Sequence, residues 1–316
     1  MSELHLFDAS QYIYAGLYHQ TVGTGVKVVD GVYRAMEMPC AGVTNILNTY
    51  HQYRGKPGVD VLFCFDSIPT RKRELHTKLF PKIGGYKGNR KARDPAILVQ
   101  QEMAFTLCEQ IGIPFLKAEG YEADDLIASA VDYYRESYDQ LVIHSRDSDV
   151  FFLVSDNVTV EPVLRSGKFI NLSNWEKTVI KNFTVPYNLL TISKMRDGEP
   201  GDNIPYVYAK PMEAIISNLP RRRYREMGDN RLLREMIVDI VGPEDLRTLG
   251  IFDLIAPLEV PEEQVAVYSD EPDERLLAAY SIECGCTKFQ SMCPIINERV
   301  SETVNRFVDS YIELTR

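Results

Sequence analysis

Short apolar runs alternating with helical stretches dominate the first half of the chain. Four runs have the length of buried strands, at residues 4–7, 59–65, 141–143 and 158–163. Between them, apolar residues recur with helical spacing, as in residues 41–53, 95–111 and 123–134. This alternation predicts an α/β fold with a mostly parallel sheet.

The pattern changes in the second half. From about residue 184 onward it is helical, with turn signals at Pro220, Gly228–Asn230 and Gly242–Pro243 and acidic loops around residues 259–274. A length of 316 residues allows one large domain or two ordinary ones. We therefore expect an α/β core over residues 1–184 and a helical region over residues 185–316.

Composition is ordinary for a globular protein, with 45% hydrophobic and 25% charged residues. No apolar run approaches the roughly 18 residues that a membrane span needs, and the start lacks a basic signal-peptide region. These features predict a cytoplasmic protein without membrane contact. The six cysteines fit reduced thiols, and a zinc site at Cys284, Cys286 and Cys293 is a weaker alternative because no histidine lies nearby.

The net charge of −10 argues against a nucleic-acid-binding protein. Its distribution reverses that argument, because nine basic and two acidic residues lie between Arg71 and Asp94, a surplus of seven positive charges. A solvated surface would also explain such a cluster, and phosphate binding is the functional alternative. The basic residues are Arg71, Lys72, Arg73, Lys78, Lys82, Lys87, Arg90, Lys91 and Arg93.

Acidic residues gather where predicted strands end, at the sheet edge where α/β proteins bind ligands. A turn residue or a helix start explains one or two of them, but not nine. Mutually repelling carboxylates need cations, and oxygen ligands suit Mg²⁺ or Mn²⁺. Two such ions can catalyse phosphodiester hydrolysis. The nine are Asp8, Asp66, Glu122, Asp124, Asp125, Asp147, Asp149, Glu199 and Asp202.

Four sequence blocks between Asp8 and about Asn218 resemble those of the 5′ nuclease family. That family includes 5′→3′ exonucleases and flap endonucleases of phages and bacteria and the nuclease domain of bacterial DNA polymerase I. The blocks occur in the family's order and cover about two thirds of the chain. They are Tyr86–Arg90 (YKGNR), Gly120–Leu126 (GYEADDL), Asp147–Asp149 (DSD) and Gly201–Pro205 (GDNIP).

The resemblance implies a PIN-like α/β core, a helical arch at about residues 70–105, and a C-terminal helical region with a degenerate helix-three-turn-helix that grips duplex DNA. Asp8, Asp66, Glu122, Asp124 and Asp125 would surround a first Mg²⁺. Asp147, Asp149, Glu199 and Asp202 would reach a second. Lys87 and Arg90 would act on the scissile phosphate, and Tyr86 would stack on a base. Further nucleic-acid contacts would come from Arg71, Lys72, Arg73, Lys91, Lys210, Arg221, Arg222 and Arg223.

The implied activity is hydrolysis of branched or 5′-ended DNA by a monomer during replication or repair, with RNA in RNA/DNA hybrids as a further candidate substrate. Two alternatives stay open: a nucleic-acid-binding homologue without turnover, and a PIN-type ribonuclease.

Three positions depart from the family pattern. Glu199 stands where aspartate is usual in the family. Ala15 stands at a position where many relatives have an arginine. No glycine follows Gly201 until Gly228, so Tyr206, Tyr208 and Pro211 occupy the region of a glycine hairpin that contacts phosphate and K⁺ in relatives. We therefore expect a weaker grip on duplex DNA, indifference to K⁺, and partial replacement of these contacts by Arg221–Arg223.

Overall fold

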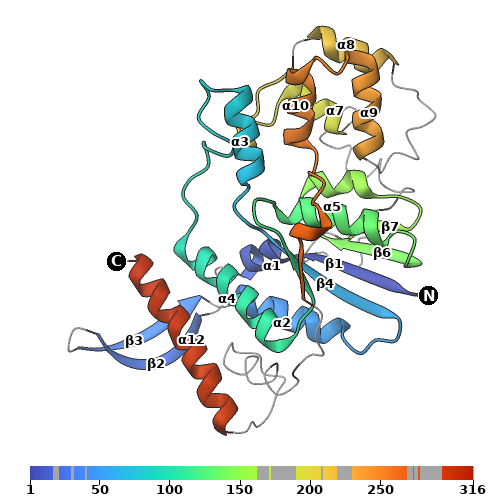
Figure 1. Ribbon diagram of the computed structural model, residues 1–316. Coiled ribbons are helices and arrows are strands. Elements are labelled where there is room, and N and C mark those ends of the chain that lie inside the picture. Colours follow the sequence, from blue (N-terminus) through green and yellow to red (C-terminus); the bar gives the residue numbers. More distant parts are fainter. Residues whose placement is uncertain are drawn as a thin grey trace. The chain divides into compact units, whose positions relative to one another are not determined.

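The computed structural model has an α/β fold (Figure 1), as the sequence predicts. It describes residues 1–16, 21–29, 32–39, 41–161, 171, 190–207, 209–218, 230–268, 273, 277 and 294–315. The predicted strands occur as β1 (Glu3–Asp8), β4 (Val59–Phe65), β6 (Gln140–His144) and β7 (Val158–Val160). Helices α2 (Ala41–Tyr53), α4 (Pro95–Ile111) and α5 (Ala123–Tyr134) have the predicted bounds.

The strands of the described residues form two sheets. One has six strands in the order β7-β6-β1-β4-β5-β8, where β5 is Phe115–Lys117 and β8 is Ala266–Tyr268. Strands β6 and β7 pair in parallel, with Leu141 opposite Val158 and Ile143 opposite Val160. All four of these side chains are buried, which explains why apolar residues occupy these positions.

The chain divides into two compact units. The first comprises residues 1–6, 66–91 and 117–265, and the second comprises residues 7–65, 92–116 and 266–316.

In the second unit, helix α1 (Ala9–Gly16) packs against α2 and α4. Gly42 permits the approach of α1 and α2, because a Cβ there would lie 2.6 Å from the Ile13 Cα. The unit also contains an antiparallel hairpin of β2 (Thr21–Val29) and β3 (Val32–Pro39), which the sequence analysis did not predict. Helix α12 (Pro294–Thr315) packs against α4 and this hairpin.

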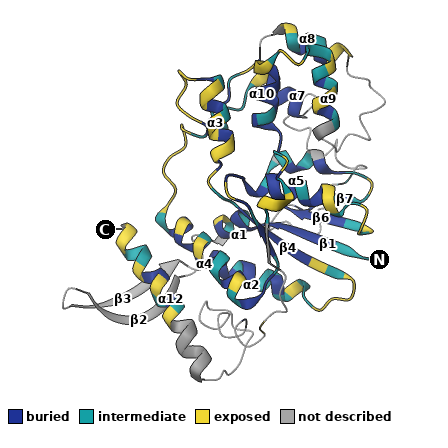
Figure 2. Ribbon diagram, viewed as in Figure 1, coloured by how far each residue is buried: buried dark blue, intermediate teal, exposed yellow. Residues whose placement is uncertain are grey.

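In the first unit, five helices share a hydrophobic core that includes Phe80, Met195, Ile215, Ile237 and Phe252. Figure 2 shows that much of the visible surface of helix α3 is exposed. The helices are α3 (Thr70–Leu79), α7 (Leu190–Asp197), α8 (Ala209–Asn218), α9 (Asn230–Val241) and α10 (Leu246–Ile255).

Helices α7 and α8 flank the residues where the sequence departs from the family's glycine hairpin. The two helices pack together, and the connection between them contains the short 3₁₀ turn η3 (Pro200–Asp202). Gly198 lies before this turn with a left-handed φ of 76°, where an added Cβ would lie 2.8 Å from the Ile204 carbonyl oxygen. Two further 3₁₀ turns in the described residues are η1 (Ser148–Leu153) and η5 (Glu262–Gln264).

Several predictions fall on residues outside the described part. They concern the boundary at residues 184–185, Arg221–Arg223 and the Cys284, Cys286 and Cys293 thiols. Within the described part, Cys64 and Cys108 are buried free thiols. Among the described helices, none combines the length and apolar character that crossing a membrane requires.

Candidate metal and phosphate site

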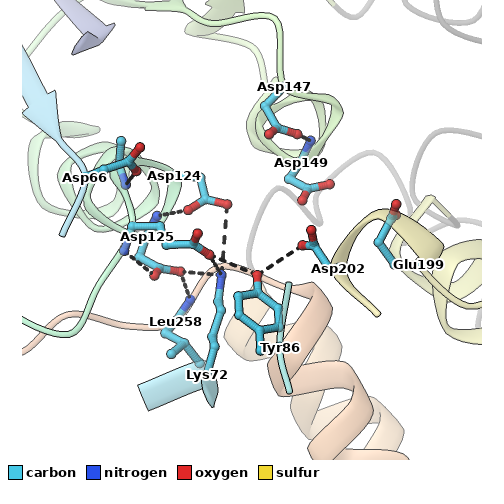
Figure 3. A network of polar contacts seen from close by, with 12 residues as sticks. Asp66, Lys72, Tyr86, Asp124, Asp125, Asp147, Asp149, Glu199, Asp202 and Leu258 are labelled. Atoms are coloured by element: carbon cyan, nitrogen blue, oxygen red, sulfur yellow. Dashed lines mark hydrogen bonds and ion pairs between the residues drawn. The ribbon is translucent and has the colours of Figure 1, made fainter. Parts of the chain in front are cut away.

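The first turn of α5 collects three carboxylates. Glu122 precedes the helix, and its backbone N–H donates to Asp125 Oδ2 at 2.9 Å, while the Asp125 N–H donates to Asp124 Oδ1 at 2.9 Å. The Leu258 N–H donates to Asp125 Oδ1 at 2.7 Å. Glu122, Asp124 and Asp125 each present an oxygen within 4.8 Å of the others. Figure 3 shows Asp124 and Asp125 of this cluster beside Lys72.

Asp66 joins this group from the residue that follows β4. Its Oδ1 accepts a hydrogen bond from the Ala123 N–H at 2.8 Å, which connects the end of the strand to the first turn of α5. Asp66 therefore lies next to the first turn of α5, and its role as a metal ligand stays a prediction.

Asp147 and Asp149 follow β6. Asp147 Oδ1 accepts from the Asp149 N–H at 3.0 Å and caps η1. Asp149 forms an ion pair with Lys194 of α7, and the same ammonium lies 3.1 Å from Glu199 Oε2. Lys194 thus connects two predicted metal ligands, a role that the sequence analysis missed.

The segment around Lys87 is fixed by the α7–α8 connection. The Lys87 N–H donates to the Asp202 carbonyl oxygen at 3.0 Å, and Arg90 Nε donates to the Gly201 carbonyl oxygen at 3.0 Å. Lys87 has a left-handed φ of 57°, an uncommon conformation for a residue with a Cβ. These backbone contacts maintain that conformation and direct the Lys87 ammonium to Glu122.

Tyr86 lies between two of the acidic groups. Its hydroxyl oxygen is 2.9 Å from Glu122 Oε2 and 3.0 Å from Asp202 Oδ2, and its ring is buried. Arg90 forms an ion pair with Asp202, and Lys87 Nζ lies 3.8 Å from the same carboxylate. The structure therefore corrects the expectation that Tyr86 is available for base stacking, because burial and its hydroxyl contacts hold it inside the site.

Lys72 also differs from its predicted role. Its side chain is 2% exposed, and its Nζ lies 3.1 Å from Asp125 Oδ1, 3.4 Å from Glu122 Oε2 and 4.0 Å from Asp124 Oδ2. This ammonium does not face solvent, so we correct its assignment as a surface contact to nucleic acid. Lys72, His76 and Phe80 form the buried face of α3 and its end, and this i, i+4, i+8 spacing was the sequence signal.

The other basic residues predicted to contact nucleic acid differ from Lys72 in their exposure to solvent. Arg71, Arg73, Lys91 and Lys210 are exposed, whereas Arg221–Arg223 lie outside the described residues.

Asp8 belongs to the second unit, where it is buried at the end of β1 and its Oδ1 accepts from the Gln11 N–H at 3.2 Å. Its participation in metal binding stays a prediction.

The cations of the site only partly compensate its carboxylates. Burial would raise the pKa of Glu122, but Lys72 and Lys87 outweigh it and lower that pKa to about 2. Burial raises the pKa of Asp124 well above its usual value despite Lys72. Burial and the neighbouring Asp147 raise the pKa of Asp149 to about 6 despite Lys194. The uncompensated negative charge of these carboxylates therefore favours binding of a further cation.

The donor set determines which cation fits. The clustered ligands of the first unit are all carboxylate oxygens, which suit a hard divalent ion better than zinc with its nitrogen and sulfur ligands. The Lys87 ammonium contacts Glu122 of this cluster, and the exposed Arg90 guanidinium forms an ion pair with Asp202. The fold and the site together define an α/β protein that can hold a cation next to an anionic ligand.

Sequence comparison gives the family. The family described as "5′-3′ exonuclease, N-terminal resolvase-like domain" matches residues 3–182, more than half of the chain. The chain belongs to this family.

Two curated relatives are named "5′-3′ exonuclease". The protein of Buchnera aphidicola subsp. Schizaphis graminum is 28% identical over 203 residues, covering 64% of each chain. That of Aquifex aeolicus is 28% identical over 227 residues, covering 70% of each chain. The chain thus spans somewhat less than two thirds of the first relative's length. A solved structure, the T5 D15 protein co-crystallized with metal ions, is 15% identical with a TM-score of 0.49, covering 97% of this chain and 99% of that chain.

Proposed function

We propose that this protein is a divalent-metal-dependent, structure-specific 5′ nuclease that hydrolyses DNA phosphodiester bonds as a 5′→3′ exonuclease or flap endonuclease. The observation that carries the proposal is the meeting of Glu122, Asp124 and Asp125 with the Lys87 ammonium in a chain of the 5′-3′ exonuclease family. The names of the curated relatives support it.

Mg²⁺ is the proposed metal, and Mn²⁺ could replace it. Glu122, Asp124, Asp125 and Asp66 would hold a first ion, with Asp8 as a further ligand, and Asp147, Asp149, Glu199 and Asp202 would serve a second. When bound, such ions supply a water of lowered pKa and neutralise charge on the phosphate.

The protein's own cations position the substrate. Lys87 and Arg90 would donate hydrogen bonds to the scissile phosphate and stabilise its developing charge. Tyr86 contacts Glu122 and Asp202 and thereby fixes the spacing between the α5 carboxylates and the α7–α8 connection. The exposed Arg71, Arg73, Lys91 and Lys210 would contact the nucleic-acid backbone.

A cleavage assay tests this proposal and its two alternatives. One 5′-flap DNA and its RNA equivalent are incubated with the protein in Mg²⁺ and in EDTA, with Asp124→Asn as the inactive control. We expect Mg²⁺-dependent release of the flap or of 5′ nucleotides from DNA. Binding without cleavage would indicate a catalytically silent homologue, and cleavage of RNA alone would indicate a PIN-type ribonuclease. An RNA/DNA hybrid in the same assay tests the additional substrate.

A further inference from the structure

Lys72 is a fully buried lysine among acids that the proposed function assigns to a metal. The ammonium has three protons and three carboxylates around it, two within 3.4 Å and one at 4.0 Å. The same three carboxylates form the cluster whose oxygens lie within 4.8 Å of one another. Lys72 therefore binds the oxygen atoms that a divalent ion would need.

The position of Lys72 is fixed by its helix. Lys72 and His76 lie on the buried face of α3, whereas Arg71, Arg73 and Glu74 are exposed. His76 Nε2 is 2.8 Å from the Asn203 carbonyl oxygen, which anchors α3 to the α7–α8 connection. Gly120, just before the acidic turn, also packs closely on α3, because a Cβ there would lie 2.8 Å from Thr70 Oγ1. The helix thus holds the lysine against the carboxylates.

We propose that Lys72 is a built-in counter-ion of the Glu122–Asp124–Asp125 cluster, which keeps the cluster assembled in metal-free protein and competes with the divalent ion for its oxygens. Lys72 is thus a positioning residue that sets metal affinity. This inference rests on the proposed function, since it assumes that the cluster binds a divalent ion.

Two opposite effects follow from removing the charge. Without the ammonium, the buried Glu122 and Asp125 and the partly buried Asp124 lose their common cation, which destabilises metal-free protein. The same loss makes the site more negative and frees its oxygens, which strengthens binding of a dication. If Lys72 served only to pack α3, its replacement would lower stability equally with and without metal. Lower stability without metal together with tighter metal binding therefore distinguishes the counter-ion role from a packing role.

The test compares wild type with Lys72→Met, which keeps most of the side-chain length without the charge. Mg²⁺ is titrated into EDTA-treated, dialysed protein by calorimetry, and thermal unfolding is followed in EDTA and in saturating Mg²⁺. We expect Lys72→Met to unfold several degrees lower in EDTA, to recover most of that difference in Mg²⁺, and to bind Mg²⁺ at least about tenfold more tightly. Lys78→Met, on the exposed face of α3, is the control and is expected to change neither quantity.

Two further variants keep the test decisive. Lys72→Arg retains the charge and is expected to restore stability in EDTA. Lys72→Met combined with Asp125→Asn removes one cation and one anion, and is expected to be more stable in EDTA than Lys72→Met alone, even if the single variant does not fold without metal.

Weaker Mg²⁺ binding by Lys72→Met, an equal loss of stability in both conditions, or no recovery in the double variant would overturn the counter-ion role. If wild type fails to bind Mg²⁺, or if Asp124→Asn binds it equally well, the proposed metal site itself is wrong. The failures of the two proposals are therefore distinguishable.

Discussion

The Lys194 ammonium lies 3.1 Å from Glu199 Oε2 and also contacts Asp149, so one buried lysine joins η1 to the α7–α8 connection. Glu199 is the position at which the sequence departs from the aspartate usual in the family. Its longer side chain reaches Lys194. The pKa of Asp149 is nevertheless raised to about 6 by burial and by Asp147.

This raised pKa predicts the pH dependence of stability in metal-free protein. An aspartate in the unfolded chain titrates near pH 4, so Asp149 stabilises the fold below about pH 4, and this contribution is lost as the pH rises through about 6. The Asp149→Asn variant lacks the titration. Its free energy of unfolding relative to wild type is expected to increase between pH 4 and 7 by no more than about 3 kcal/mol. Urea unfolding in EDTA measures this difference, and exposed Asp156→Asn serves as the control. A pH-independent difference would contradict the assignment.

Asp124→Asn is expected to abolish cleavage without unfolding the protein. Asp124 has a raised pKa because of burial and repulsion by Asp125 and Glu122, so removing its charge relieves repulsion in metal-free protein. Its midpoint of thermal unfolding in EDTA is expected to equal or exceed that of wild type. Unchanged turnover at saturating Mg²⁺ would show that Asp124 is not part of the active site.

Lys87 is expected to act on the transition state more than on binding. Lys87→Ala removes the ammonium that contacts Glu122, and the single-turnover rate on a 5′-flap DNA is expected to fall by about 10²-fold or more. Lys91→Ala, which alters an exposed lysine, is expected to weaken affinity while the rate at saturating substrate stays close to wild type. A Lys87 variant with only reduced affinity would make Lys87 an ordinary phosphate contact.

Tyr86→Phe tests the hydroxyl between Glu122 and Asp202 with little change in volume. Both carboxylate oxygens lose a contact at about 3 Å, so the free energy of unfolding in EDTA is expected to fall by about 1–3 kcal/mol. Tyr133→Phe, at a tyrosine that is 63% exposed, is expected to change it by less than about 0.5 kcal/mol. Chemical denaturation of the two variants gives the comparison, and equal effects would remove the proposed role of the hydroxyl.

The arginine run at residues 221–223 is predicted to bind duplex DNA in place of the glycine hairpin. Replacing Arg221, Arg222 and Arg223 together with alanine is expected to lower the salt dependence of duplex affinity by up to about three units, because each lost phosphate contact removes about 0.9 unit. Cleavage at saturating substrate is expected to stay nearly unchanged, and exchange of Na⁺ for K⁺ at constant ionic strength to have no effect. An unchanged slope or a strong K⁺ requirement would indicate that the hairpin contact persists.

Local sequence patterns predicted much of the α/β core. The bounds of α2, α4 and α5 follow from apolar periodicity together with local signals such as the Asp94 cap and the left-handed Gly112 that ends α4. The hairpin of β2 and β3 was not predicted, because its residues are of mixed polarity and form no continuous apolar run.

The sequence by itself determined the candidate acidic residues and their order, because each follows a strand, begins a helix or lies in a turn, and these are local features. Only the tertiary structure decided which cations lie among them. The sequence analysis assigned Lys72 and Tyr86 to nucleic-acid binding and did not single out Lys194, yet all three side chains are buried beside carboxylates. Which face of α3 or α7 turns inward depends on packing against distant segments such as the α7–α8 connection. Buried charge is tolerated only where partners from those segments compensate it, and local sequence does not contain that information.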